Sequence, residues 1–383
     1  MSSSNDNVTR WVRPEIRALS AYHVPDSGDF IKLDAMENPY HWPETMVEQW
    51  LAILGETELN RYPNSSPAGL KKSLAQAMGV PADVEILLGN GSDELIQMIA
   101  MALALPGRKV LAPEPSFVMY KMIATLSGMD YVGVPLLSNA VEDSSNEAEN
   151  FGLDLQAMLE AIKEHQPAVV FLAYPNNPTG NLFDRDAVKA IIEASPGLVV
   201  VDEAYHAFAG DSFMTELGAG KGSGAEKYDN LVVMRTVSKM GLAGLRLGLL
   251  AGPSAWLAEF DKVRLPYNIN VLTQRSAEFA LANREILDRQ TRKICIDREK
   301  LMQDLEAIKG ICPFSSRANF ILFRVSVTGG KNATEVFGSL KAQGVLIKNL
   351  SAAGGLLQDC LRVTVGMPEE NEAFLSALKN ALD

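Results

Sequence analysis

AVVFLAYPNNPTGNLFDRDAVKAIIEASPGLVVVDEAY, residues 168–205, contains the pattern that decides the fold. Two continuous apolar runs, 168–173 and 197–201, are separated by a stretch with helical periodicity. Strands that are apolar along their whole length and are joined through helices are typical of a parallel sheet covered on both faces. Ligands of such sheets bind beyond the carboxyl ends of the strands, and both runs have their polar residues there. The stretch therefore predicts an α/β fold with its chemistry at one edge of the sheet.

The same pattern extends outward from this stretch in both directions. VEILLGNGS (84–92), KVLAPEPS (109–116) and NLVVMRTVSK (230–239) are further apolar runs that end in polar or turn residues. Helical stretches such as DELIQMIAMALA (93–104) lie between them. We therefore expect a large domain with a mostly parallel central sheet that is covered by helices.

The pattern of apolar and charged residues changes from about Thr273 onward. Long helices with charged faces are followed by the alternating strands NFILFRV, VLIKNL and CLRVTV and by a last helix, which indicates a smaller α+β domain. The expected organisation is an N-terminal arm that includes part of the small domain (1–45), a large cofactor-binding domain (46–272) and a small C-terminal domain (273–383). Residues 138–152, which are acidic, and residues 218–230 are expected to be solvent loops.

Composition excludes several classes of function. The chain has 383 residues and a formal net charge of −12, which argues against non-specific binding to nucleic acid or to an anionic membrane. The start of the chain does not resemble a signal peptide, and no apolar run approaches the roughly 20 residues that cross a bilayer. Three scattered cysteines fit a reducing compartment, and four distant histidines indicate no metal site. We expect a cytoplasmic protein without metal.

Two stretches offer groups for an anion and for a polar ring substituent. Ser92 and Asp93 open a helix after a glycine-rich turn, where free N–H groups and the helix dipole attract a phosphate; a plain N-cap is the alternative. In YPNNPTG (174–180), two prolines favour an extended, stiff turn that directs Asn177 inward, although Asn-Pro is also common in surface turns.

Two charged residues end apolar strands. Asp202 follows a run of valines, and a buried carboxylate there requires a cation, with Tyr205 close by; a helix cap is the alternative. Lys239 lies between the hydroxyls of Thr236 and Ser238 and the guanidinium of Arg246, a set that suits a phosphate. A lysine desolvated beside other cations has a lowered pKa and can attack a carbonyl carbon, whereas a surface lysine is the alternative.

Together these candidates form an anion site, a carboxylate for a cationic ring, an amide and a phenol for a ring oxygen, and an amine for an aldehyde. Pyridoxal phosphate needs these groups. The motifs YPNNPTG, DEAY (202–205), SKMGLAGLRLG (238–248) and LRVTVG (361–366) resemble the fold-type I aminotransferases over most of the chain. KLDAMENPY (32–40), RYPNSSPAGLKKSLA (61–75), GNGSDELIQMI (89–99), PYNINVLTQ (266–274) and ANFILFRV (318–325) are similar to the class II branch that acts on a phosphorylated amine.

The resemblance implies roles for the candidates. Lys239 would bind the cofactor covalently and move the substrate proton, and Asp202 would keep the ring nitrogen protonated. Phe117 would stack on the ring, where relatives often have tyrosine. The other implied contacts are those of Asn177 and Tyr205 with the ring oxygen, and those of Ser92, Asp93, Thr236, Ser238 and Arg246 with the phosphate.

The resemblance also implies a homodimer and a substrate site for small molecules, an amino acid and a phosphorylated amine or ketone. Tyr62 would reach the cofactor phosphate of the neighbouring subunit, and Arg362 would bind the substrate carboxylate, with an exposed strand arginine as the alternative. Tyr22 and Asn38 would lie near the substrate. At Lys348, relatives often have an arginine followed by an aspartate; lysine keeps the charge and loses the planar fork.

Other functions remain open from the sequence. Within the same fold, the chain could be an aminotransferase for aromatic or other amino acids, or a decarboxylase of a phosphorylated amine. A non-catalytic binding module is disfavoured because Lys239, Asp202 and Arg362 are all present. A nicotinamide dehydrogenase is disfavoured because the glycine fingerprint is incomplete.

Overall fold

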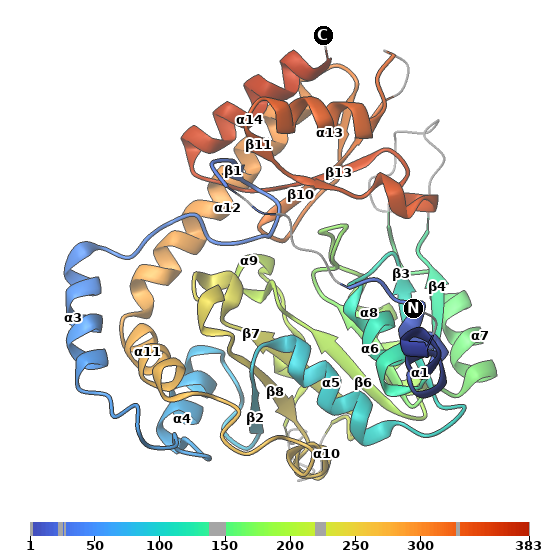
Figure 1. Cartoon of the computed structure of the whole chain (residues 1–383), viewed down its shortest axis with the longest axis vertical. Coiled ribbons are helices and arrows are strands. Elements are labelled where there is room, and N and C mark those ends of the chain that lie inside the picture. Colours follow the sequence, from blue (N-terminus) through green and yellow to red (C-terminus); the bar gives the residue numbers. More distant parts are fainter. Residues whose placement is uncertain are drawn as a thin grey trace.

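The computed structural model describes residues 3–21, 26, 28–137, 151–218, 227–326 and 330–382. Tyr22 and most of the acidic stretch 138–152 lie outside the described residues. The chain forms a large body that contains the central sheet and a smaller unit at one end of it, with one long helix running between them (Figure 1). Within the described ranges, no helix has the length and apolar character needed to cross a membrane.

The central sheet has seven strands in the order β2-β8-β7-β6-β5-β3-β4. Only β8 runs antiparallel to its neighbours, so the predicted mostly parallel sheet is confirmed. The strands are β2 (Glu85–Gly89), β3 (Lys109–Glu114), β4 (Asp130–Pro135), β5 (Val169–Ala173), β6 (Leu198–Asp202), β7 (Leu231–Thr236) and β8 (Gly248–Gly252). Because β5, β6 and β7 are parallel neighbours, the residues that follow them meet at one edge of the sheet.

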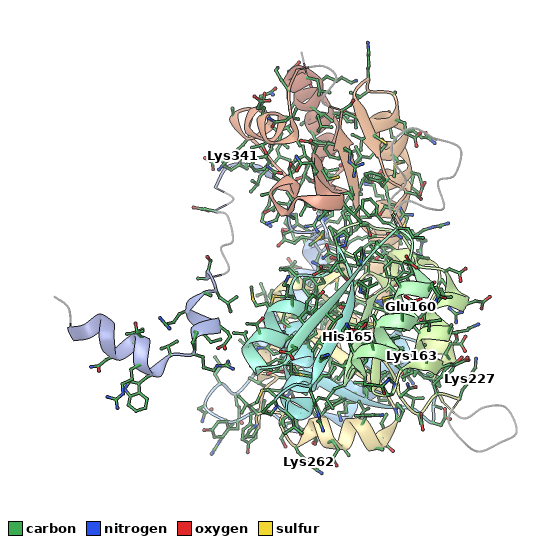
Figure 2. All side chains as sticks on the ribbon, turned by 90° about the vertical axis from the view of Figure 1, so that its right-hand side faces the viewer. Glu160, Lys163, His165, Lys227, Lys262 and Lys341 are labelled. Carbon is green, nitrogen blue, oxygen red and sulfur yellow. The ribbon has the colours of Figure 1, made fainter. Side chains whose placement is uncertain are left out.

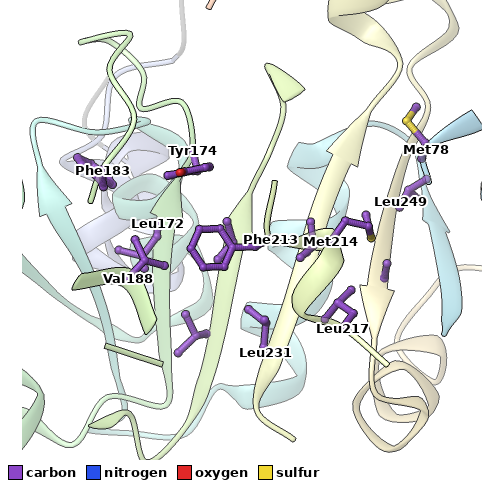
Figure 3. Close-up of a cluster of buried hydrophobic side chains, with 14 of the residues drawn as sticks. Met78, Leu172, Tyr174, Phe183, Val188, Phe213, Met214, Leu217, Leu231 and Leu249 are labelled. Atoms are coloured by element: carbon purple, nitrogen blue, oxygen red, sulfur yellow. The ribbon is translucent and has the colours of Figure 1, made fainter. Parts of the chain in front are cut away.

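Alternating side chains of these strands enter two separate cores, which explains why a central strand such as β5 is apolar along its whole length. One core lies between the sheet and α5 (Ser92–Leu103), α6 (Met119–Ser127) and α10 (Ser254–Asp261). The other core involves α4 (Ala68–Ala77), α7 (Leu155–His165), α8 (Arg185–Ala194) and α11 (Val271–Ala282). Figure 3 shows Phe213, from the 3₁₀ turn η2 (Phe213–Glu216), among the sheet side chains Leu172, Leu231 and Leu249 of this second core.

The small domain contains a four-stranded antiparallel sheet in the order β12-β13-β10-β9. Its strands are β9 (Ile311–Pro313), β10 (Phe320–Val325), β12 (Lys348–Asn349) and β13 (Cys360–Thr364). A second sheet pairs β1 (Ile31–Lys32) with β11 (Val345–Leu346), and we propose that this N-terminal segment is part of the small domain. Three helices pack here: α12 (Arg284–Glu306), α13 (Ala333–Ala342) and α14 (Pro368–Leu382).

The two domains share α12. Leu287, near its start, belongs to a core of the large domain, whereas Ile294 and Leu301 belong to the core of the small domain. Helix α11 packs on α4 and on α3 (Glu44–Gly55), which are elements of the large domain. We therefore propose that the domain boundary lies within α12, after Leu287, and not at the expected residue 273.

The N-terminal arm begins with α1 (Ser3–Trp11) and α2 (Pro14–Arg17). Arg13 donates a 2.5 Å hydrogen bond to the carbonyl of Leu126 at the end of α6. Helix α1 itself projects from the body (Figure 2), and Trp11 is 75% exposed. The remaining short elements are α9 (His206–Ala209) and the 3₁₀ turns η3 (Ser238–Met240), η4 (Ala243–Leu245), η6 (Ser351–Ala353) and η7 (Gly355–Leu357).

Candidate active site

A cavity of about 590 Å³ opens at the carboxyl ends of β5, β6 and β7, within the range of small-molecule sites. All ten residues of this chain that the sequence assigns to a cofactor, apart from Tyr62, line it: Ser92, Asp93, Phe117, Asn177, Asp202, Tyr205, Thr236, Ser238, Lys239 and Arg246. Met36, Ala173, Pro175 and Ala204 complete the lining. The sheet topology thus brings together residues that are far apart in sequence.

Asp202 is a buried carboxylate at the end of β6. The phenol of Tyr120 donates to Oδ2 at 2.7 Å, and the backbone N–H of Ala204 donates to Oδ1 at 3.1 Å. Burial raises the pKa of Asp202 to about 6, although both hydrogen bonds lower it. Both donors found among the described residues are neutral, so the carboxylate fits a cationic group such as a protonated ring nitrogen.

Lys239 follows β7 in the turn η3, and its amine faces the cavity. The Nζ atom donates to the carbonyl of Ala35 at 3.1 Å and lies 5.8 Å from the ring centre of Tyr205. Burial, together with the nearby positive charge of Arg362, lowers the pKa of Lys239 to about 8. A substantial fraction of the amine is therefore neutral near pH 8, which is the form that attacks an aldehyde.

One end of the cavity is built for an anion. Ser92 and Asp93 form the first turn of α5, preceded by Gly91 at a φ of +85°. A Cβ atom at position 91 would lie 2.6 Å from Nη2 of Arg246, so only glycine allows the guanidinium this close. The Thr236 and Ser238 hydroxyls lie 2.8 Å apart beside it. This set of N–H groups, hydroxyls and a guanidinium fits a phosphate group.

Asn177, Tyr205 and Arg362 form a chain of side-chain contacts. The amide Nδ2 of Asn177 donates to the Tyr205 hydroxyl at 3.1 Å, and its Oδ1 accepts from Arg362 at 2.5 Å. All three side chains are buried. The amide and phenol therefore meet at the cavity, as expected of a pair that holds one ring oxygen.

Arg362 lies on β13 of the small domain and reaches the edge of the cavity. Its guanidinium also donates to the carbonyl of Asp34 at 3.2 Å. Lys348 pairs directly with Arg362 in the antiparallel register of β12 and β13, so the two side chains leave the same face of the sheet. The predicted substrate cations are thus neighbours in the fold.

Three other residues that the sequence predicts for the site are Asn38, Tyr62 and Tyr22. Asn38 does not line the cavity: its amide donates to the carbonyl of Met240 at 3.3 Å and to Gln290 at 3.1 Å, behind the turn of Lys239. Tyr62 is 81% exposed and stacks on Tyr267 at 4.6 Å, away from the cavity of its own chain. Tyr22 lies outside the described residues.

Two features of the site were missed in the sequence. Tyr120 contacts Asp202, and no local pattern in the sequence indicates this contact, because Phe117 precedes α6 whereas Tyr120 lies within it. A buried ion pair joins Glu203 to Arg235, with Nε and Nη2 at 2.8 and 2.7 Å from Oε2. Its signal was strand alternation, because Glu203 and Arg235 adjoin Asp202 and Thr236 and so point to the opposite face of the sheet.

Comparison with known families now assigns the class. The aminotransferase class I and II family matches residues 28–378. The chain belongs to this family and is an aminotransferase, with pyridoxal phosphate as the cofactor; the predicted family and fold are thereby confirmed.

Individual relatives are more specific. A histidinol-phosphate aminotransferase 2 of Nitrosococcus oceani is 56% identical over 98% of both chains. A histidinol-phosphate aminotransferase of Chromobacterium violaceum is 50% identical over 97% of this chain and 98% of its own. In fold, the chain is similar to the crystal structure of histidinol-phosphate aminotransferase from Sinorhizobium meliloti in complex with pyridoxal-5'-phosphate, with a TM-score of 0.78, 24% identity and 97% coverage of both chains.

Proposed function

We propose that the protein is a cytoplasmic histidinol-phosphate aminotransferase of histidine biosynthesis. It moves an amino group between L-glutamate and imidazole acetol phosphate, which gives 2-oxoglutarate and L-histidinol phosphate. The names of relatives at 44–56% identity support this substrate. The observation that carries the proposal is the pairing of Lys348 with Arg362 on one sheet face, where Arg362 contacts the cavity residue Asn177, because two adjacent cations suit a phosphate-bearing substrate.

The reaction is divided among the residues of the cavity. When bound, pyridoxal phosphate supplies an aldehyde that carries the amino group and a ring that accepts an electron pair. The amine of Lys239 would be the base that takes the proton from the substrate carbon and the acid that gives it back. Asp202 keeps the ring nitrogen protonated, and Asn177 and Tyr205 hold the ring oxygen.

Residues of the small domain hold the anionic group of each substrate. Arg362 binds the carboxylate of glutamate in one half of the exchange and, with Lys348, the phosphate of histidinol phosphate in the other half. Glutamate and histidinol phosphate both present an anion, so one pair of cations serves both. Lysine at 348 contributes charge without the bidentate geometry of arginine, and we expect it to add affinity for the phosphate more than orientation.

The substrate is tested by amino transfer to 2-oxoglutarate from histidinol phosphate, histidinol and phenylalanine. We expect kcat/KM for histidinol phosphate to exceed that for histidinol by at least about tenfold, because the phosphate is bound by two cations. Lys348→Gln reduces that preference, whereas Lys341→Gln, at an exposed lysine of α13 (Figure 2), leaves it unchanged. If phenylalanine is a much better donor than histidinol phosphate, an aromatic aminotransferase takes the place of the proposal.

We also propose that the enzyme is a homodimer in which Tyr62 completes the phosphate site of the neighbouring subunit. Tyr62 and its stacking partner Tyr267 are both exposed, at 81% and 42%, and Leu59 and Leu265 are exposed at 71% each. Exposed aromatic and apolar residues of this kind are typical of protein interfaces. Tyr62 does not reach the cavity of its own chain, which supports a role in another copy.

Subunit mixing tests the shared site. Tyr62→Ala and Lys239→Ala each give a nearly inactive homodimer, because every site lacks one group. A mixed dimer contains one site with both native residues, and we expect activity to return on mixing, toward half that of the native enzyme per mixed dimer. Mixing Asp202→Asn with Lys239→Ala is the control, since both residues belong to the same chain's site and no native site is formed. Equal results in the two mixtures would contradict the role of Tyr62.

A further inference from the structure

Tyr120 occupies one fixed position behind the cavity. Its side chain is 1% exposed, stacks on Phe171 of β5 at 4.6 Å and meets Phe117 edge-on at 5.6 Å. Phe117 is itself part of the cavity wall. With the ring in this position, the phenol donates to Oδ2 of Asp202 at 2.7 Å. A hydrogen bond of this length from a hydroxyl to a carboxylate belongs to the strong class.

The surroundings of Asp202 oppose its negative charge. Burial raises its pKa most, and the nearby acids Asp93 and Glu203 raise it further. Tyr205, from the residues after β6, is buried beside it and is uncharged. The Tyr120 phenol and the Ala204 N–H are the groups that lower it. Burial and the charge of Asp202 also raise the pKa of Tyr120 well above its ordinary value, so the phenol keeps its proton and donates it.

We propose that Tyr120 is a positioning residue of the aminotransferase: its phenol holds Asp202 as the carboxylate that keeps the cofactor's ring nitrogen protonated. This inference rests on the proposed cofactor site. One proton lies between the ring nitrogen and the carboxyl group, and the Tyr120 hydrogen bond favours its place on nitrogen. Without that bond the proton moves to Asp202, so a neutral acid faces a neutral ring; no other reactant is gained or lost.

Tyr120→Phe removes only the hydroxyl oxygen and keeps both ring contacts. Tyr174→Phe is the matched control, because the Tyr174 phenol also donates to a carboxylate at 2.7 Å, that of Asp211, and lies outside the cavity wall. The holoenzymes are reconstituted with pyridoxal phosphate labelled with ¹⁵N in the ring. The ¹⁵N chemical shift of the ring nitrogen then reports its protonation directly, and kcat and KM are measured in parallel.

In the native enzyme and in Tyr174→Phe, we expect the shift of a protonated ring nitrogen. In Tyr120→Phe the shift moves toward that of a neutral ring, and kcat falls roughly 10- to 100-fold with a smaller change in KM, as for a hydrogen bond to a charged group. A ring nitrogen in Tyr120→Phe that stays protonated as in the native enzyme overturns the inference.

Two further experiments distinguish a failure of this inference from a failure of the variant to fold and from a failure of the cofactor assignment. If Tyr120→Phe does not fold, 3-fluorotyrosine at position 120 serves, since it keeps the hydroxyl and makes it a stronger donor. We expect its ring nitrogen to remain protonated over a wider pH range than in the native enzyme, and an unchanged range overturns the inference. A native protein that captures no pyridoxal phosphate overturns the cofactor assignment itself.

Discussion

Replacing Lys239 with alanine abolishes amino transfer, with an expected loss of at least about 10⁴-fold in kcat, because covalent capture and proton transfer both disappear. The cofactor still binds through its phosphate, since Thr236, Ser238 and Arg246 remain. Single-turnover absorbance with glutamate measures the loss. Lys262→Ala, at an exposed lysine that follows α10 (Figure 2), is the control and retains native activity.

Borohydride reduction identifies the same lysine chemically. We expect the cofactor to be fixed on the peptide that contains Lys239, and a label on another lysine would refute the assignment. The neutral amine is the attacking form, so the rate of cofactor capture by the apoenzyme increases with pH through about 8, the pKa of Lys239. A rate that keeps increasing toward the ordinary lysine pKa of 10.5 would show that the amine is not desolvated as described.

Asp202→Asn has the second largest expected effect, a loss of roughly 100- to 1000-fold in kcat, because one preorganised charge is removed while the shape is kept. Asp211→Asn is the matched control, since Asp211 also accepts a tyrosine hydrogen bond and lies outside the cavity wall. Steady-state kinetics and the cofactor dissociation constant measure both variants. Native kcat in Asp202→Asn would contradict the pairing with the ring nitrogen.

For the same variant, we also predict how the stability of the apoenzyme depends on pH. The folded-state pKa of Asp202, about 6, lies above its ordinary value of 3.8, so the buried charge destabilises the fold. The penalty is absent below about pH 4, grows up to about pH 6 and is then constant, at up to about 3 kcal/mol. Apo Asp202→Asn is therefore more stable than the apo native protein at pH 7 and equally stable at low pH, as thermal unfolding would show.

The parallel sheet was predictable because its central strands are buried on both faces, so a run such as 169–173 contains no solvent-facing position. The cavity followed from the same reasoning. Asp202 ends β6, and Ser92, Asn177 and Lys239 follow shortly after β2, β5 and β7; the topology then brings these strand ends together. For these residues, position along the chain determines position in space.

Contacts between distant side chains could not be predicted in the same way. The hydrogen bond of Tyr120 with Asp202 joins α6 to β6, and no local pattern indicates it. Asn38 is a similar case: its motif implies a place near the substrate, but its amide donates to Gln290, a residue more than 250 positions away, and it does not line the cavity. The domain boundary also depends on which core α12 contacts along its length, and charge pattern alone does not reveal this.

The ion pair of Glu203 and Arg235 limits how this enzyme can diversify. Losing either member strands an opposite charge beneath the sheet, at about 3–5 kcal/mol, a large share of the stability of an ordinary domain. The two positions are therefore expected to be inherited together. Lys348 is partly open to solvent on a two-residue strand, so its replacement leaves no buried opposite charge of this kind. We therefore expect new substrate specificities to arise by substitution at Lys348 and not at the Glu203–Arg235 ion pair.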